Sequence, residues 1–170
     1  MPSSRSFVVR KAAVLGAGVM GAQIAAHLVN ANVETLLFEL PAKDGDPNSN
    51  VLKAIDNLKK LEPSPLSIRL KADCIRAANY DQHLGLLQEC DLVIEALSER
   101  VDWKADLYGK VAPHIAGHAI FASNTSGLSI NKLAESFPAH LRRRFCGVHF
   151  FNPPRYMHLV ELIACNGTDP

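Results

Sequence analysis

The stretch VHFFNPPRYMHLVEL near the end of the sequence contains two histidines and one glutamate, His149, His158 and Glu161. A histidine held by a carboxylate can act as a general acid or base, because imidazole titrates near neutral pH. His158 and Glu161 are three residues apart, which on a helix would make them a pair or two metal ligands. The surrounding Leu, Val and Ile residues, after a Pro-Pro break, favour a strand instead. Residues at odd separation on a strand point to opposite faces, which disfavours this pair.

His149 is the better partner for Glu161, across the turn that the two prolines form. It lies near the end of the β-type run at residues 145–151, at the edge where a doubly wound sheet binds its ligands. Glu161 would hold one ring nitrogen and leave the other free to accept a proton. The alternative is a structural histidine with a charge at the rim, and residue types alone do not separate the two interpretations.

The segment GAGVMG indicates a second site, where the chain passes from an apolar run to a helical one. In the pattern G-x-G-x-x-G, Gly16 permits the tight turn, Gly18 lets the backbone approach a pyrophosphate, and Gly21 allows close packing of helix and strand. The following helix N-terminus, at Val19 and Met20, offers free N–H groups and a positive dipole to phosphates. Glycine-rich turns also occur for steric reasons alone, so the motif needs support.

Glu39 supplies that support at the end of a second apolar run, 18 residues after Gly21. A carboxylate at this place accepts hydrogen bonds from the adenosine ribose and would repel a 2′-phosphate, while Leu40 beside it offers no cation. NAD is therefore expected rather than NADP. A Rossmann-like domain without a dinucleotide is the competing interpretation.

Strand-like and helical segments alternate along the chain. This order predicts a single α/β domain over residues 1–170, with a Rossmann-type, doubly wound, mostly parallel sheet and helices on both faces. We expect strands at residues 7–15, 33–40, 74–79, 91–97, 118–124, 145–151 and 157–164, and helices at 22–32, 51–61, 80–90, 100–115 and 129–137.

Composition excludes several classes of protein. The formal net charge is +1 with 21% charged residues, so no nucleic-acid partner is expected. No apolar run reaches the roughly 18 residues of a membrane span, and no separate signal segment begins the chain. The widely spaced Cys74, Cys90, Cys146 and Cys165 show no zinc-type pattern. No metal is therefore expected, and the reducing cytoplasm is the expected compartment.

Four blocks of the sequence also resemble the L-3-hydroxyacyl-CoA dehydrogenase family. They are GAGVMGAQIA at 16–25, DLVIEALSER at 91–100, FASNTSGLSI at 121–130 and GVHFFNPPRYMHLVELI at 147–163. The resemblance implies the family's N-terminal NAD-binding domain. It also implies NAD-dependent oxidation of 3-hydroxyacyl-CoA to 3-oxoacyl-CoA, as in fatty-acid β-oxidation.

The resemblance further implies roles for individual residues. His149 corresponds to the general base on the 3-hydroxyl, Glu161 to its partner, and Ser126 to the serine that hydrogen-bonds the reacting oxygen. A serine or threonine in this segment could equally cap the next helix.

Other positions of the family's motifs concern nucleotide and substrate. The family's further NAD contacts fall on Glu99, Lys104 and Asn152, although Glu99 could simply begin a helix. The lysine that contacts the CoA phosphate has Lys59 and Lys60 as its nearest candidates.

Partners are also implied by the resemblance. The family's helical C-terminal domain, which would begin after Glu161, is expected to be missing from this chain, together with the homodimer that it forms. The isolated domain is then expected to turn over weakly or not at all. Two alternatives remain open: an NAD-dependent dehydrogenase of a hydroxy acid without CoA, and a dinucleotide-binding module without catalysis.

Overall fold

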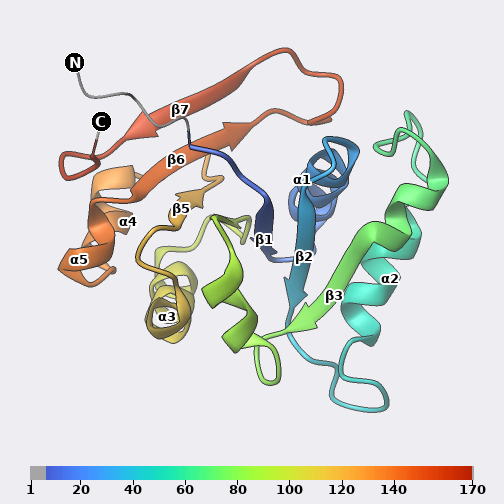
Figure 1. Cartoon of the computed structure of the whole chain (residues 1–170), viewed down its shortest axis with the longest axis horizontal. Coiled ribbons are helices and arrows are strands. Elements are labelled where there is room, and N and C mark those ends of the chain that lie inside the picture. Colours follow the sequence, from blue (N-terminus) through green and yellow to red (C-terminus); the bar gives the residue numbers. More distant parts are fainter. Residues whose placement is uncertain (1–6, 170) are drawn as a thin grey trace.

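A computed structural model describes residues 7–169 of the chain, so the first six residues and the last one of the expected domain lie outside it. Its strands form one sheet in the order β3-β2-β1-β4-β5-β6-β7 (Figure 1). Neighbouring strands from β3 to β6 are parallel, and β7 is antiparallel to β6. The strands are β1 (Lys11–Leu15), β2 (Glu34–Glu39), β3 (Ile75–Asn79), β4 (Leu92–Glu95), β5 (Ile120–Ser123), β6 (Phe145–Phe150) and β7 (Val160–Ala164).

Helices cover both faces of this sheet, as the sequence predicts. One apolar cluster joins α1 and α2 to the sheet, and a second joins α3, α4 and α5 to the other face (Figure 1). The bounds are α1 (Val19–Asn30), α2 (Ser49–Leu58), α3 (Val101–Val111), α4 (Ile130–Glu135) and α5 (Ala139–Arg142), with 3₁₀ turns η1 (Arg69–Cys74), η2 (Leu84–Glu89) and η3 (Ala112–His114).

The apolar strands explain why two layers of helices are needed. Ala13 and Leu15 of β1 belong to the α3 side of the core, whereas Val14 between them belongs to the α1 side. Successive strand side chains point to opposite faces, so an uninterrupted apolar strand has to be buried on both. The predicted doubly wound architecture is therefore confirmed.

Several element boundaries differ from the expectation. The first strand begins at Lys11, where pairing with Glu34 starts, and not at residue 7. The segment 80–90 is a 3₁₀ turn from Leu84, because the side-chain oxygen of Asn79 accepts the N–H groups of Asp81 and Gln82 and forms a turn there.

The helix expected at 100–115 also ends early, at Val111, and continues as a 3₁₀ turn that contains Pro113. Proline lacks the N–H that an α-helix would need at that position. Ser129 caps α4 by accepting the N–H of Lys132, so this helix begins at Ile130.

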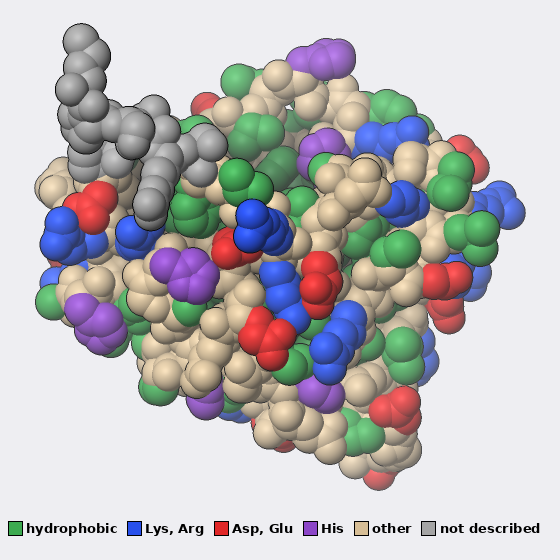
Figure 2. All heavy atoms as spheres, in the orientation of Figure 1, with side chains coloured by type: hydrophobic (Ala, Val, Ile, Leu, Met, Phe, Trp, Pro, Cys, Tyr) green, Lys and Arg blue, Asp and Glu red, His purple; other side chains and the backbone are tan. Residues whose placement is uncertain are grey.

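On the face shown in Figure 2, lysine and arginine side chains are intermixed with carboxylates. Pairs such as Lys11 with Glu34 and Glu89 belong to this pattern of local neutralisation. Among residues 7–169, no helix combines the length and apolar character that a membrane crossing requires.

The carboxyl ends of the parallel strands meet at one edge of the sheet, and this edge positions the site. Strand order reverses between β1 and β4, the place where open α/β sheets bind ligands. Gly16 follows β1 with a φ of 101°, and a Cβ there would lie 3.1 Å from the carbonyl oxygen of Ala96, just after β4. A Cβ on Gly21 would lie 1.8 Å from the carbonyl oxygen of Gly16, so α1 packs directly on the turn.

We expect Gly21→Ala to lower the free energy of unfolding by about 1–3 kcal/mol or more, because the added methyl overlaps main chain that has no room to move. Chemical denaturation of the 170-residue chain measures this change. Gly109→Ala is the matched control, since its Cβ would meet no atom within 4 Å in the exposed part of α3 and alanine favours a helix. A Gly21→Ala protein as stable as the wild type would contradict the close packing of α1 on the turn.

Candidate active site

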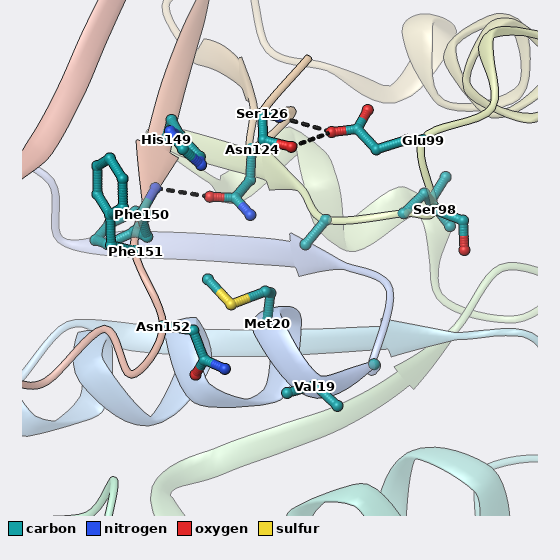
Figure 3. A pocket seen from close by; sticks show the side chains of 13 residues that line it. Val19, Met20, Ser98, Glu99, Asn124, Ser126, His149, Phe150, Phe151 and Asn152 are labelled. Atoms are coloured by element: carbon teal, nitrogen blue, oxygen red, sulfur yellow. Dashed lines mark hydrogen bonds between the residues drawn. The ribbon is translucent and has the colours of Figure 1, made fainter. Parts of the chain in front are cut away.

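A pocket of about 460 Å³ opens at the carboxyl edge of the sheet. It is lined by residues 18–20 of the glycine turn and α1, by 96–99 after β4, by Asn124 and Ser126 after β5, and by 149–152 at the end of β6. Figure 3 shows His149, Asn124 and Ser126 at one end of this pocket, and Val19, Met20 and Asn152 at the other. Segments that are far apart in the sequence thus share one cavity.

His149 and Glu161 lie directly opposite each other on the antiparallel strands β6 and β7. Their side chains meet, with Nδ1 of His149 2.8 Å from Oε2 of Glu161. The histidine side chain is 17% exposed and lines the pocket, whereas that of Glu161 is 47% exposed. With Nδ1 engaged by the carboxylate, Nε2 is the ring nitrogen that remains for a ligand.

His158 lies neither on a helix nor on a strand, the two possibilities that the sequence offers for it. It is exposed and precedes β7, which begins only at Val160. The turn that carries it is attached to another loop, because the Tyr156 hydroxyl and the Arg155 guanidinium both donate to the carbonyl oxygen of Ser64.

Glu99 and Ser126 are joined by hydrogen bonds between the β4 and β5 ends of the pocket. Oε1 of Glu99 accepts the main-chain N–H of Ser126 at 2.6 Å and its hydroxyl at 3.1 Å (Figure 3). Its Oε2 accepts the Thr125 hydroxyl at 2.5 Å. Burial acts to raise the pKa of Glu99, but the hydrogen bonds from Thr125 and Ser126 outweigh it and hold this pKa below its usual range. Glu99 is thus a carboxylate that orients Ser126.

The cap of α4 is Ser129, so Ser126 is not the residue that caps this helix. Asn124, two residues before Ser126, is a pocket residue that the sequence hypotheses did not include. Its Oδ1 accepts the N–H of Phe150 at 2.9 Å and ties the end of β5 to the end of β6. The position of Asn124 directly after an apolar strand is the sequence feature that could have identified it as a pocket residue.

Asn152 lies on the pocket wall near α1. Its Oδ1 accepts a hydrogen bond from Nε2 of Gln23 at 3.2 Å. Gln23 is itself buried in α1, so this contact joins the segment after β6 to the helix that follows the glycine turn.

The glycine turn has the features that a bound dinucleotide requires. The first turn of α1 has no side-chain cap, which leaves its N–H groups for a phosphate. A Cβ on Gly18 would meet no atom within 4 Å, so the space beside the turn is open, and Val19 is 70% exposed. The glycine turn therefore fits the pyrophosphate of a bound dinucleotide.

Glu39 holds the same turn from the end of β2. Its Oε2 accepts the N–H of Ala17 at 2.8 Å, and its Oε1 accepts the N–H of Leu40 at 2.8 Å. A carboxylate fixed in this way lies beside the turn, in the position that the sequence predicts for ribose recognition.

Three lysines named in the sequence hypotheses, Lys59, Lys60 and Lys104, lie outside the lining of the pocket. Lys104 does not line the pocket: it is 0% exposed, and its ammonium lies 2.6 Å from Oε1 of Glu95 beneath the segment 96–99. Lys59 and Lys60 follow α2 and do not line the pocket either. The Lys59 ammonium pairs with Asp56 and Asp73, whereas Lys60 is exposed.

Comparison with known proteins agrees with this geometry. The family described as "3-hydroxyacyl-CoA dehydrogenase, NAD binding domain" matches residues 11–170. The chain is 45% identical over 156 residues to the "Putative fatty acid oxidation complex trifunctional enzyme" of Rickettsia felis. The aligned region covers 91% of this chain and 22% of that protein.

Solved structures show the same likeness. The 3-hydroxybutyryl-CoA dehydrogenase of Escherichia coli K12 superposes with a TM-score of 0.78 at 29% identity, over 95% of this chain and 34% of that one. The (S)-3-hydroxybutyryl-CoA dehydrogenase of Ralstonia eutropha gives 0.76 at 29% identity, over 95% and 56%. The chain thus spans only part of the relatives it matches. It belongs to the 3-hydroxyacyl-CoA dehydrogenase family and corresponds to the family's NAD-binding domain.

Proposed function

We propose that the chain serves NAD-dependent oxidation of an L-3-hydroxyacyl-CoA to the 3-oxoacyl-CoA, with His149 as the general base. The observation that carries this proposal is the 2.8 Å contact between Nδ1 of His149 and Glu161, at the wall of the pocket that also contains Ser126. The related dehydrogenases named above act on 3-hydroxybutyryl-CoA, as their names state.

A bound NAD would supply the acceptor for the hydride that leaves C3 of the substrate. His149 takes the 3-hydroxyl proton at Nε2, and the negative charge of Glu161 stabilises the imidazolium that results. Ser126, oriented by Glu99, hydrogen-bonds the reacting oxygen. The uncapped turn of α1 would hold the pyrophosphate and Glu39 the adenosine ribose. Glu99 and Asn152 would contribute further contacts to the nucleotide.

Partners beyond the substrate belong to the same proposal. All five residues of the edge strand β7 are exposed, including Val160, Leu162 and Ile163. Exposed apolar side chains on an edge strand are typical of a surface that packs against another domain. We infer that the family's helical domain covers this strand in a longer protein, where it would also complete the acyl pocket and the homodimer.

The CoA phosphate and the compartment complete this proposal. Lys60 is exposed and is the candidate for the CoA phosphate, since the ammonium of Lys59 already pairs with Asp56 and Asp73. All four cysteines are free thiols, which fits the reducing cytoplasm.

The activity is tested by NADH formation from L-3-hydroxybutyryl-CoA in the protein that carries this domain. His149→Gln should reduce kcat by about 10²–10⁴, because a positioned base contributes that much, with unchanged affinity for NAD. His158→Gln is the matched control, since this histidine is exposed and outside the pocket. Equal kcat values for His149→Gln and wild type would end the assignment of His149 as the base.

Glu161→Gln should lower kcat by roughly 10–100-fold, because an amide keeps the hydrogen-bonding shape but loses a charged hydrogen bond to the imidazolium. Steady-state kinetics with calorimetric NAD binding separates this loss from a loss of cofactor. An unaltered kcat would show that the contact on β7 is structural.

Glu39→Gln should weaken NAD binding and narrow the preference for NAD over NADP, because the neutral amide no longer repels a 2′-phosphate. Isothermal calorimetry of the 170-residue chain with each dinucleotide measures both effects. If the ratio of the two affinities stays at its wild-type value, the adenosine ribose is recognised by another residue.

Substrates distinguish the alternative functions. A free 3-hydroxy acid oxidised as fast as its CoA ester would favour the dehydrogenase of a hydroxy acid without CoA. NAD binding with no hydride transfer from either compound, even in a protein that also contains the family's helical domain, would favour a binding module.

A further inference from the structure

A buried carboxylate lies directly beneath the pocket, at the end of β4. Glu95 is 0% exposed, and its Oε1 accepts the Lys104 ammonium and the main-chain N–H of Leu97, each at 2.6 Å. Its Oε2 accepts the hydroxyls of Tyr108 and Ser123, each at 2.8 Å. Lys104, Tyr108 and Ser123 are also 0% exposed, so the four side chains form one closed network.

Stability alone is a poor explanation for this network. A buried ion pair has a desolvation cost that its attraction only partly repays, and apolar residues of similar volume often serve as well or better. Val93 and Ile94, which precede Glu95 on β4, are apolar and buried, and Tyr108 packs against the buried rings of Phe121 and Phe137. The charged network is therefore better understood by what it holds in place.

Leu97 is held on both of its main-chain polar groups. Its N–H donates to Glu95, and its carbonyl oxygen accepts from the Lys104 ammonium at 3.4 Å. Leu97 lines the pocket between Ala96, which approaches Gly16, and Glu99, which orients Ser126. Fixing Leu97 thus fixes the pocket wall that runs from the glycine turn to Ser126.

We propose that Glu95, Tyr108 and Ser123 are positioning residues for the nicotinamide half of NAD, which hold the segment 96–99 from beneath without touching the cofactor. This inference rests on the proposed function, because the nicotinamide has to lie at the His149 and Ser126 end of the pocket.

The adenosine half of NAD provides an internal reference. Glu39 and the N-terminus of α1 lie at the other end, and Glu39 reaches the turn through Ala17 and not through the network. Loosening the segment 96–99 should therefore weaken ligands that contain the nicotinamide and leave ADP binding unchanged.

Tyr108→Phe and Ser123→Ala test the inference, because each removes one hydrogen bond to Oε2 of Glu95 and neither residue lines the pocket. By calorimetry on the 170-residue chain, each should weaken NADH binding on the order of fivefold, the effect of one hydrogen bond, with unchanged affinity for ADP. Thr35→Val is the matched control: it removes a buried hydroxyl bonded to the Val33 carbonyl at the opposite end of the sheet. It should lower the melting temperature and leave both affinities unaltered.

If the wild type binds NADH, and both variants keep its ratio of NADH affinity to ADP affinity, the positioning role is wrong. The proposed function is not affected by that result. The same result with a lowered melting temperature would mean that the network is merely structural. A wild-type chain that binds ADP but not NADH would overturn the proposed function, and the inference with it.

Discussion

The buried charge of Glu95 is the constraint on which the arrangement of the pocket depends. An ionised carboxylate inside a protein is tolerated only when its oxygens are paired. Here the partners come from α3, from the end of β5 and from the chain directly after β4. Satisfying one carboxylate therefore joins three segments beneath the pocket, and it sets the path of the loop that leads to Glu99.

Above this layer, each functional group is held by a hydrogen bond to a different strand end. Glu99 orients Ser126, Asn124 accepts the N–H of Phe150, and Glu161 holds His149. Such a site is preorganised, since the partners of each side chain are fixed before any ligand arrives. The edge strand β7 supplies Glu161 and is exposed along its whole length, so the proposed base and the candidate surface for a further domain share one hairpin.

Local patterns in the sequence were sufficient for the fold and misleading at some boundaries. Apolar runs predicted every strand, and alternation with helical segments predicted the parallel order. The segment 80–90 failed because Asn79 forms a turn through its side chain, a choice that periodicity does not reveal. Glu95 was visible as a charge within a buried run, yet its partners Tyr108 and Ser123 lie 13 and 28 residues away.

The sequence by itself determined the glycine turn and the acidic end of the second strand, because each depends on neighbouring residues. Only the tertiary structure decided which side chains meet. Register places Glu161 opposite His149, and packing places Lys104 under the pocket instead of in it. The physical reason is that register and burial depend on contacts between distant segments, and residue spacing along the chain does not contain them.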